Sequence, residues 1–182
     1  FDDKIFFESV ELIKKRLKIN KFKLSNFKDK LVCDVGCGSA RSCYLAASEG
    51  AKMVVGIDSS KKNIDFNKKK FSKLKNVKFI VGDNVNLKLK SNSFDVTIGW
   101  GVIHHTIDMF GSLNELIRIT KKNGKIFLLI YGDNGLRWSL IKKLRPLAKT
   151  IGIRNIKKSM KKAKFKPNTI KNFIDDLFVP IQ

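Results

Sequence analysis

Acidic residues and paired glycines follow short apolar runs of strand length, and their types and spacing could do chemistry. Asp34 leads into the glycine turn of VCDVGCGSAR, residues 32–41. Asp58 ends the run VVGID, Asp83 ends FIVGD, and GWGVIHHT follows a fourth run. Carboxylates accept hydrogen bonds from hydroxyl and amino groups, and glycine lets the backbone approach a ligand closely. A strand-to-helix turn of this kind lies where nucleotides bind in parallel sheets.

Apolar strands alternate with amphipathic helices along most of the chain. This alternation predicts an α/β fold in which helices cover both faces of a parallel sheet. Strands are expected at residues 30–36, 52–58, 77–83, 94–101 and 125–132, and helices at residues 5–18, 39–50, 59–74 and 108–124, with a serine cap opening the third helix and Gly124 closing the fourth.

The polar clusters meet at one edge of this sheet, because the carboxyl ends of parallel strands share an edge. Asp58 is placed to accept both hydroxyls of a ribose, and Asp83 could accept from an adenine amino group. Each acid also has an ordinary structural explanation, since Asp58, Ser59 or Ser60 could cap a helix and Asp83 could shape a turn. Their convergence at one edge favours ligand binding.

Two familiar nucleotide motifs do not fit the glycine turn. The dinucleotide fingerprint requires a third small residue where Arg41 stands, and the phosphate loop GxxxxGK[ST] is absent. An acid before the first glycine suits a ligand with an ammonium group better than a pyrophosphate.

Five segments, in order, resemble the class I S-adenosylmethionine-dependent methyltransferases. They are VCDVGCGSAR, VVGIDSS, FIVGDN, SFDVTIGWGVIHHTID and LNELIRITKKNGKIFLLIYG, within residues 28–132. The resemblance implies a Rossmann-like three-layer α/β/α sandwich with parallel strand order 3-2-1-4-5, and S-adenosylmethionine as the cofactor. The loop after the fourth strand looks like the small-molecule branch (methyltransferase type 11, ubiquinone-biosynthesis-like), whose members methylate quinones, sugars and other metabolites.

The resemblance also assigns roles to residues of this sequence. The glycine turn would cradle the methionine part of the cofactor, the second strand end would hold the ribose, and the third would meet the adenine. The backbone after the fourth strand would line the methyl-donor pocket, while the side chains of Trp100 and Trp138 are expected to pack. The cofactor-binding residues are then Asp34, Gly36, Cys37, Gly38, Asp58, Ser59, Asp83, Asn84, Trp100 and Gly101.

His104 and His105 are the two histidines of the chain, and both lie in the loop after the fourth strand. Histidine titrates near neutral pH and can accept a proton from a hydroxyl or carbon nucleophile. The position of His105 recurs in the family pattern, so His105 is the predicted catalytic base. The alternative is a structural histidine that hydrogen-bonds the loop or shapes the donor pocket.

The sequence departs from the family pattern in two places. Ala40 stands where a third glycine is common, and its small side chain should be tolerated. The family's sheet normally finishes with an antiparallel hairpin, which is not evident before Gln182, and the chain begins with Phe1. We therefore expect a core domain at residues 1–132, a helical basic segment at residues 133–182 that serves as a substrate lid, and a truncated reading frame.

The chain is strongly basic, with 38 Lys and Arg residues against 16 Asp and Glu residues and a formal net charge of +22. Such a charge suits nucleic acid or an anionic membrane, but the Lys excess is spread along the chain with abundant Ile and Asn, as A/T-rich coding produces. Nucleic acid is not the expected partner, because the Asn-Pro-Pro-aromatic signature is missing after the fourth strand. A basic RNA- or membrane-surface-binding module that kept the fold is the alternative function.

One local concentration of positive charge, residues 137–171, contains no acid. Residues 137–151 are expected to form an amphipathic helix with Leu140, Leu144, Leu147 and Ile151 on one face, followed by weaker helices at residues 153–165 and 168–178. The favoured interpretation is that this face packs against the domain. The alternative is that it meets an apolar substrate or makes peripheral contact with an anionic membrane.

The cysteines and apolar runs bound the remaining possibilities. Cys33, Cys37 and Cys43 form no disulfide framework, which suggests a reducing, cytoplasmic location. Their spacing provides no metal-ligand set, so no metal is expected. The longest apolar runs have strand length, and neither a signal peptide nor a membrane span is expected.

Overall fold

The structure is a computed structural model of the 182-residue chain, and it describes residues 2–130 and 136–164. For residues 136–142 and 145 it describes the backbone alone. The chain divides into two compact units, Phe1–Ile130 and Tyr131–Gln182.

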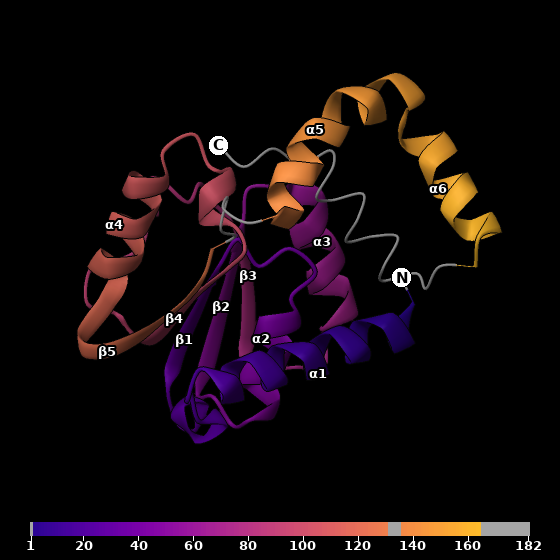
Figure 1. Ribbon diagram of the computed structural model, residues 1–182. Coiled ribbons are helices and arrows are strands. Elements are labelled where there is room, and N and C mark those ends of the chain that lie inside the picture. Colours follow the sequence, from indigo (N-terminus) through magenta and orange to yellow (C-terminus); the bar gives the residue numbers. More distant parts are fainter. Residues whose placement is uncertain (1, 131–135, 165–182) are drawn as a thin grey trace. The chain divides into compact units, whose positions relative to one another are not determined.

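Five strands form one parallel sheet in the first unit (Figure 1). The strands are β1 (Leu31–Val35), β2 (Met53–Asp58), β3 (Val77–Val81), β4 (Phe94–Trp100) and β5 (Thr120–Leu129). They lie in the order β3-β2-β1-β4-β5, and each neighbouring pair is parallel. The predicted fold and strand order are confirmed.

Helices cover both faces of this sheet and make the three predicted layers (Figure 1). On one face, α1 (Asp3–Ile19), α2 (Arg41–Ser48) and α3 (Lys61–Lys70) share a buried apolar cluster with the strands. On the other face, α4 (Met109–Ile119) contributes to a second cluster. Short 3₁₀ helices, η1 (Leu24–Phe27) and η2 (Ile103–His105), follow α1 and β4.

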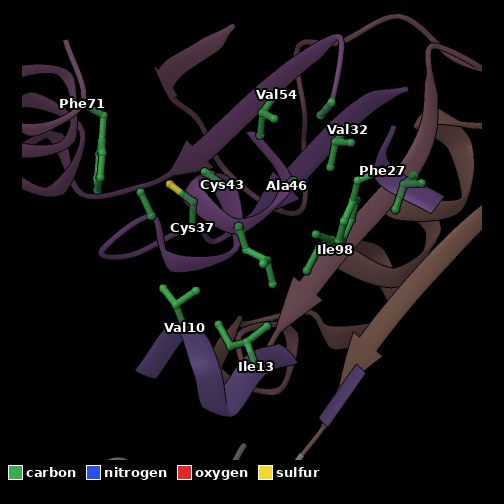
Figure 2. Close-up of a cluster of buried hydrophobic side chains, with 14 of the residues drawn as sticks. Val10, Ile13, Phe27, Val32, Cys37, Cys43, Ala46, Val54, Phe71 and Ile98 are labelled. Carbon is green, nitrogen blue, oxygen red and sulfur yellow. The ribbon is translucent and has the colours of Figure 1, made fainter. Parts of the chain in front are cut away.

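Alternate side chains of β1 enter the two clusters, as the two-residue period of a strand requires. Val32 belongs to the α1–α3 side, whereas Cys33 and Val35 belong to the α4 side. Figure 2 shows the first cluster, with Val10 and Ile13 of α1 and Cys43 and Ala46 of α2 near Val32, Val54 and Ile98 of the sheet. Because Asp34 alternates with Cys33 and Val35, its side chain is directed to the α1–α3 side, where Cys43 donates to it.

The boundary between α4 and β5 differs from the sequence prediction. The expected helix over residues 108–124 ends at Ile119, and β5 begins at Thr120, so Gly124 is not its terminator. The Thr120 hydroxyl donates to the Leu116 carbonyl at 2.5 Å and lies 2.8 Å from the Thr97 hydroxyl. Because of these contacts, β5 begins at Thr120, which pairs with Phe94. The next paired residues are Val96 and Lys125, and the register shift between Phe94 and Val96 accommodates residues 121–124.

The helix caps agree better with the sequence. Ser60 caps α3 as predicted, since its hydroxyl accepts from the Asn63 amide at 3.3 Å. The α2 helix begins after Ala40, whose φ is 60°, and no side chain caps it. The start of α2 therefore depends on contacts from elsewhere in the fold.

The second unit contains α5 (Leu136–Ile151) and α6 (Ile153–Lys162), joined at Gly152 with φ of 81°. The helix predicted at residues 137–151 is confirmed as a helix. On its predicted apolar face, Leu147 and Ile151 are exposed and Leu144 is half-buried. The helix predicted at residues 168–178 lies outside the described residues, and the roles of residues 133–182 stay predictions. In the described part of the chain, no helix is long and apolar enough to cross a membrane.

Candidate functional site

The glycine turn lies where β1 ends, between the carboxyl ends of β2 and β4. Gly36 has a φ of 71°, and a Cβ built there would collide with the Val102 side chain, so only glycine fits. Gly38 has a φ of 50°, and a Cβ built there would meet nothing within 4 Å. The turn is thus packed tightly on one side at Gly36 and open at Gly38.

Backbone and side-chain groups from neighbouring elements hold this turn. The Cys37 amide donates to the Ile57 carbonyl at 2.7 Å, and the Ala40 amide donates to the Cys37 carbonyl at 2.8 Å. The Gly38 amide donates to Asp58 Oδ2 at 2.8 Å, while the Gly38 carbonyl accepts from Asn67 Nδ2 at 2.8 Å. The peptide groups of the turn are therefore tied to both β2 and α3.

The Asp58 carboxylate accepts hydrogen bonds from three groups of the protein itself, which the sequence did not indicate. Besides the Gly38 amide, its carboxylate accepts from the Ser60 amide at 2.9 Å and from Asn63 Nδ2 at 3.3 Å. A carboxylate has about four lone-pair sites, so little of its acceptor capacity is left. A ribose that engages both oxygens must displace one of these donors, and the Asn63 bond is the longest of the three. Ser59, beside it, is exposed.

Asp34 is buried at 1% exposure beneath α2. The Cys43 thiol donates to Asp34 Oδ2 at 3.3 Å, and Asp34 Oδ1 has no hydrogen-bond partner within the described residues. Burial raises the pKa of Asp34 to about 7, although Cys43 and the charge of Arg41 oppose the shift. A buried acid with a free acceptor and a pKa near neutrality is typical of functional sites.

The third strand end brings Asp83 and Asn84 beside Asp58, because the Gly82 amide donates to the Asp58 carbonyl at 3.1 Å. Asp83 is exposed, and its carboxylate accepts from the Val85 amide at 3.1 Å, so it shapes a turn as well. Asn84 is buried, and its Oδ1 lacks a partner among the described residues. This pair supplies one exposed and one buried acceptor.

The segment after β4 completes the edge. The Trp100 ring stacks on Phe127 with centroids 5.4 Å apart, and the Arg16 guanidinium lies 5.8 Å from its centroid. The Trp100 side chain therefore packs, as predicted. Gly101 has a φ of 65°, and its amide donates to the Leu129 carbonyl at 3.0 Å.

The two histidines have different surroundings. His104 is buried at 1% exposure, and burial, with a smaller contribution from His105, lowers its pKa to about 4. His105 is half-buried, and the two ring centroids are 4.0 Å apart. His104 is thus neutral at pH 7 and inside the fold, while His105 reaches the surface of the loop.

Asn67 and Val102 are site residues that the sequence reasoning missed. Asn67 lies on the buried stripe of α3 between Ile64 and Phe71, where the pattern calls for an apolar residue. A polar residue at an apolar position was the available signal for Asn67. Nothing in the sequence marked Val102. A search of the described residues found no cluster of His, Cys, Asp and Glu that could hold a metal ion.

Asp34 gives the site a testable pH dependence. Between about pH 4 and 7 the unfolded chain ionises Asp34 while the folded protein keeps it protonated, so stability falls as the pH rises. The expected slope is at most about 1.4 kcal/mol per pH unit. Asp34→Asn removes this loss, so its stability relative to the parent protein should rise from pH 4 to 7 in urea unfolding.

Asp95→Asn provides a control with the opposite sign. Burial raises the pKa of Asp95, but its bonds from Lys121 and the Leu31 amide outweigh burial and hold the pKa below the usual range. This variant should lose stability relative to the parent as the pH rises from the folded-state pKa of Asp95 to about 4, and the difference should then stay constant from pH 4 to 7. A relative stability of Asp34→Asn that is flat from pH 4 to 7 would show that Asp34 is ionised in the folded protein.

Comparisons with known proteins agree with this geometry. A family model described as a methyltransferase domain matches residues 26–133. A demethylmenaquinone methyltransferase from Staphylococcus epidermidis is 36% identical over 99 residues, covering 53% of this chain and 41% of the relative. A tRNA U34 carboxymethyltransferase from Hahella chejuensis is 30% identical over 138 residues, covering 73% of this chain and 41% of the relative. The chain thus spans about two fifths of the length of these relatives.

A solved structure with the same fold is an S-adenosylmethionine-dependent methyltransferase from Mesorhizobium loti. It is 21% identical, has a TM-score of 0.53, and the match covers 57% of this chain and 47% of that protein. The family match extends over the glycine turn and all five strands. The chain therefore belongs to the methyltransferase-domain family, and within it to the class I S-adenosylmethionine-dependent methyltransferases.

Proposed function

We propose that this protein transfers a methyl group from S-adenosylmethionine to an oxygen or carbon atom of a small-molecule acceptor, such as a quinone, a sugar or another metabolite. Family membership supports the donor. The distribution of basic residues around the loop after β4 carries the choice of acceptor.

The donor-binding residues fit the chemistry of S-adenosylmethionine. Gly38 opens the turn to a ligand, and the unpartnered Oδ1 of Asp34 is an acceptor for its ammonium group. Asp58 is the acceptor for ribose hydroxyls, and Asp83 with Asn84 supplies acceptors for the adenine amino group. When bound, the cofactor supplies an electrophilic methyl group. Holding donor and acceptor in line is worth up to about 7–11 kcal/mol in well-oriented systems.

Basic residues are missing from the loop after β4, which would face the acceptor. The chain has 38 Lys and Arg residues, yet residues 91–117 contain none, and Asp108 lies at the end of the loop after β4. In this segment Ile107 is 97% exposed and Phe110 is 69% exposed. A polyanionic acceptor needs cationic partners near the reacting atom, whereas a compact apolar acceptor does not. This distribution favours a small molecule.

The relatives suggest the same acceptor class and one rival. The similarity to demethylmenaquinone methyltransferase supports a quinone. The similarity to tRNA U34 carboxymethyltransferase makes tRNA the second candidate, which the general basic charge of the chain also suits.

Donor binding can be measured by calorimetry with S-adenosylhomocysteine, the demethylated product. Asp58→Ala should weaken binding by roughly 1.5–3 kcal/mol, the value of a hydrogen bond to a charged group. Asp65→Ala is the matched control, because Asp65 lies on α3 and pairs with Lys61 at the surface. Equal affinities for Asp58→Ala and the parent protein would reject the ribose assignment, and no binding by the parent would reject the proposed donor.

The acceptor class can be tested with methyl-labelled S-adenosylmethionine and a mixture of bulk tRNA and organic-extractable metabolites that includes demethylmenaquinone. We expect label in the organic extract and none in acid-precipitable tRNA. Label confined to tRNA would replace the small-molecule proposal with its rival.

His105 is the proposed base that receives a proton from the acceptor on a ring nitrogen. His105→Ala should reduce the turnover rate by about 10²–10⁴-fold, the usual contribution of general base catalysis. Its affinity for S-adenosylhomocysteine should stay unchanged. Normal turnover in this variant would leave His105 with a structural role.

A further inference from the structure

The Gly38 peptide is held from both sides by side chains that come from different elements. Its amide donates to Asp58 Oδ2 at the end of β2, and its carbonyl accepts from Asn67 Nδ2 of α3, each at 2.8 Å. From this arrangement we infer that Asn67 is a positioning residue that fixes the glycine turn in the shape that accepts the donor. The statement about donor affinity rests on the proposed function, whereas the statement about the turn does not.

Asn67 is a polar residue at a position where the surroundings favour an apolar side chain. Asn67 is 0% exposed, on an α3 stripe that Ile64 and Phe71 continue. Burying an amide without partners costs free energy, and an apolar side chain would be better suited to this stripe. The bond to Gly38 offsets part of that cost through Nδ2, which also lies 3.9 Å from the Cys37 sulfur, while Oδ1 has no partner among the described residues. Asn67 thus contacts two consecutive residues of the turn.

The turn needs an external support because its own conformation is costly. Gly36, Gly38 and Ala40 all have positive φ, at 71°, 50° and 60°. Glycine loses much conformational entropy when it is ordered, and a left-handed alanine is strained. No side chain caps the start of α2 at Ala40. The Asn67 bond is therefore one of few interactions that keep the open Gly38 backbone in place before a ligand arrives.

A matched pair of asparagines separates positioning from general stability. Asn67→Leu keeps a similar volume and removes the donor, so the part-buried Gly38 carbonyl loses this partner. Asn76→Leu is the control, because Asn76 Nδ2 donates to the Ala51 carbonyl at 2.9 Å near the opposite end of β2. Both variants should lower the melting temperature. Asn67→Ala is the second variant, for use if leucine prevents folding.

The first measurement is alkylation of Cys37 by iodoacetamide in the ligand-free protein, followed by mass spectrometry. Cys37 is 7% exposed, while Cys33 and Cys43 are 0% exposed, so Cys37 reports opening of the turn. We expect at least a tenfold faster reaction in Asn67→Leu than in the parent, and the parent rate in Asn76→Leu. The parent rate in both variants would overturn the inference.

The second measurement is the affinity for S-adenosylhomocysteine at a temperature where every variant is fully folded. Asn67→Leu should bind about tenfold more weakly, the equivalent of one hydrogen bond, while Asn76→Leu should bind like the parent. Equal weakening in both variants would mean that Asn67 acts through stability alone, which overturns the positioning role. If the parent protein does not bind, the proposed function fails, and the alkylation ratio still decides whether Asn67 holds the turn.

Discussion

The hydrogen bonding of the Gly38 peptide is the interaction on which the rest of the site depends. A turn with three positive-φ residues cannot hold its shape by local preference, and it needs partners from outside. Asp58 supplies one partner from β2 and Asn67 the other from α3. Because β2 is paired with both β1 and β3, the same bonds that fix the turn also hold Asp58 in register with the end of β3, which leads into Asp83 and Asn84.

Charge is arranged in the site at a cost to stability. Burial beneath α2 raises the pKa of Asp34 to about 7, so the folded protein disfavours the ionised form of this side chain. A cationic ligand would favour the ionised form. In the proposed function, a ligand ammonium group beside Oδ1 would recover part of this energy. Half-buried Asp95 shows the opposite case, because Lys121 and the Leu31 amide stabilise its charge and lower its pKa.

The distribution of cations is as informative as their number. A formal charge of +22 suggests a polyanionic partner, but residues 91–117 carry neither Lys nor Arg, and exposed Ile107 and Phe110 lie there instead. Basic residues gather in α5 and α6 of the second unit, whose role as a lid or membrane contact stays a prediction. The net charge of the whole chain is therefore a poor guide to the acceptor. The local composition of the loop after β4 supports the proposed small-molecule acceptor.

The sequence by itself determined the α/β alternation, the order of the strands, the Ser60 cap and the meeting of Asp34, Asp58 and Asp83 at one edge. These features follow from periodicities, short motifs and family resemblance that are contained in continuous windows of the chain. The tertiary structure decided the early start of β5, where Thr120 pairs with Thr97, and the high pKa of Asp34 under α2. It also decided that Asp58 and Asn67 hold Gly38. The start of β5, the pKa of Asp34 and the bonds to Gly38 all depend on partners that are distant in the sequence. Local propensity does not indicate which distant atom will form a hydrogen bond with a buried polar group.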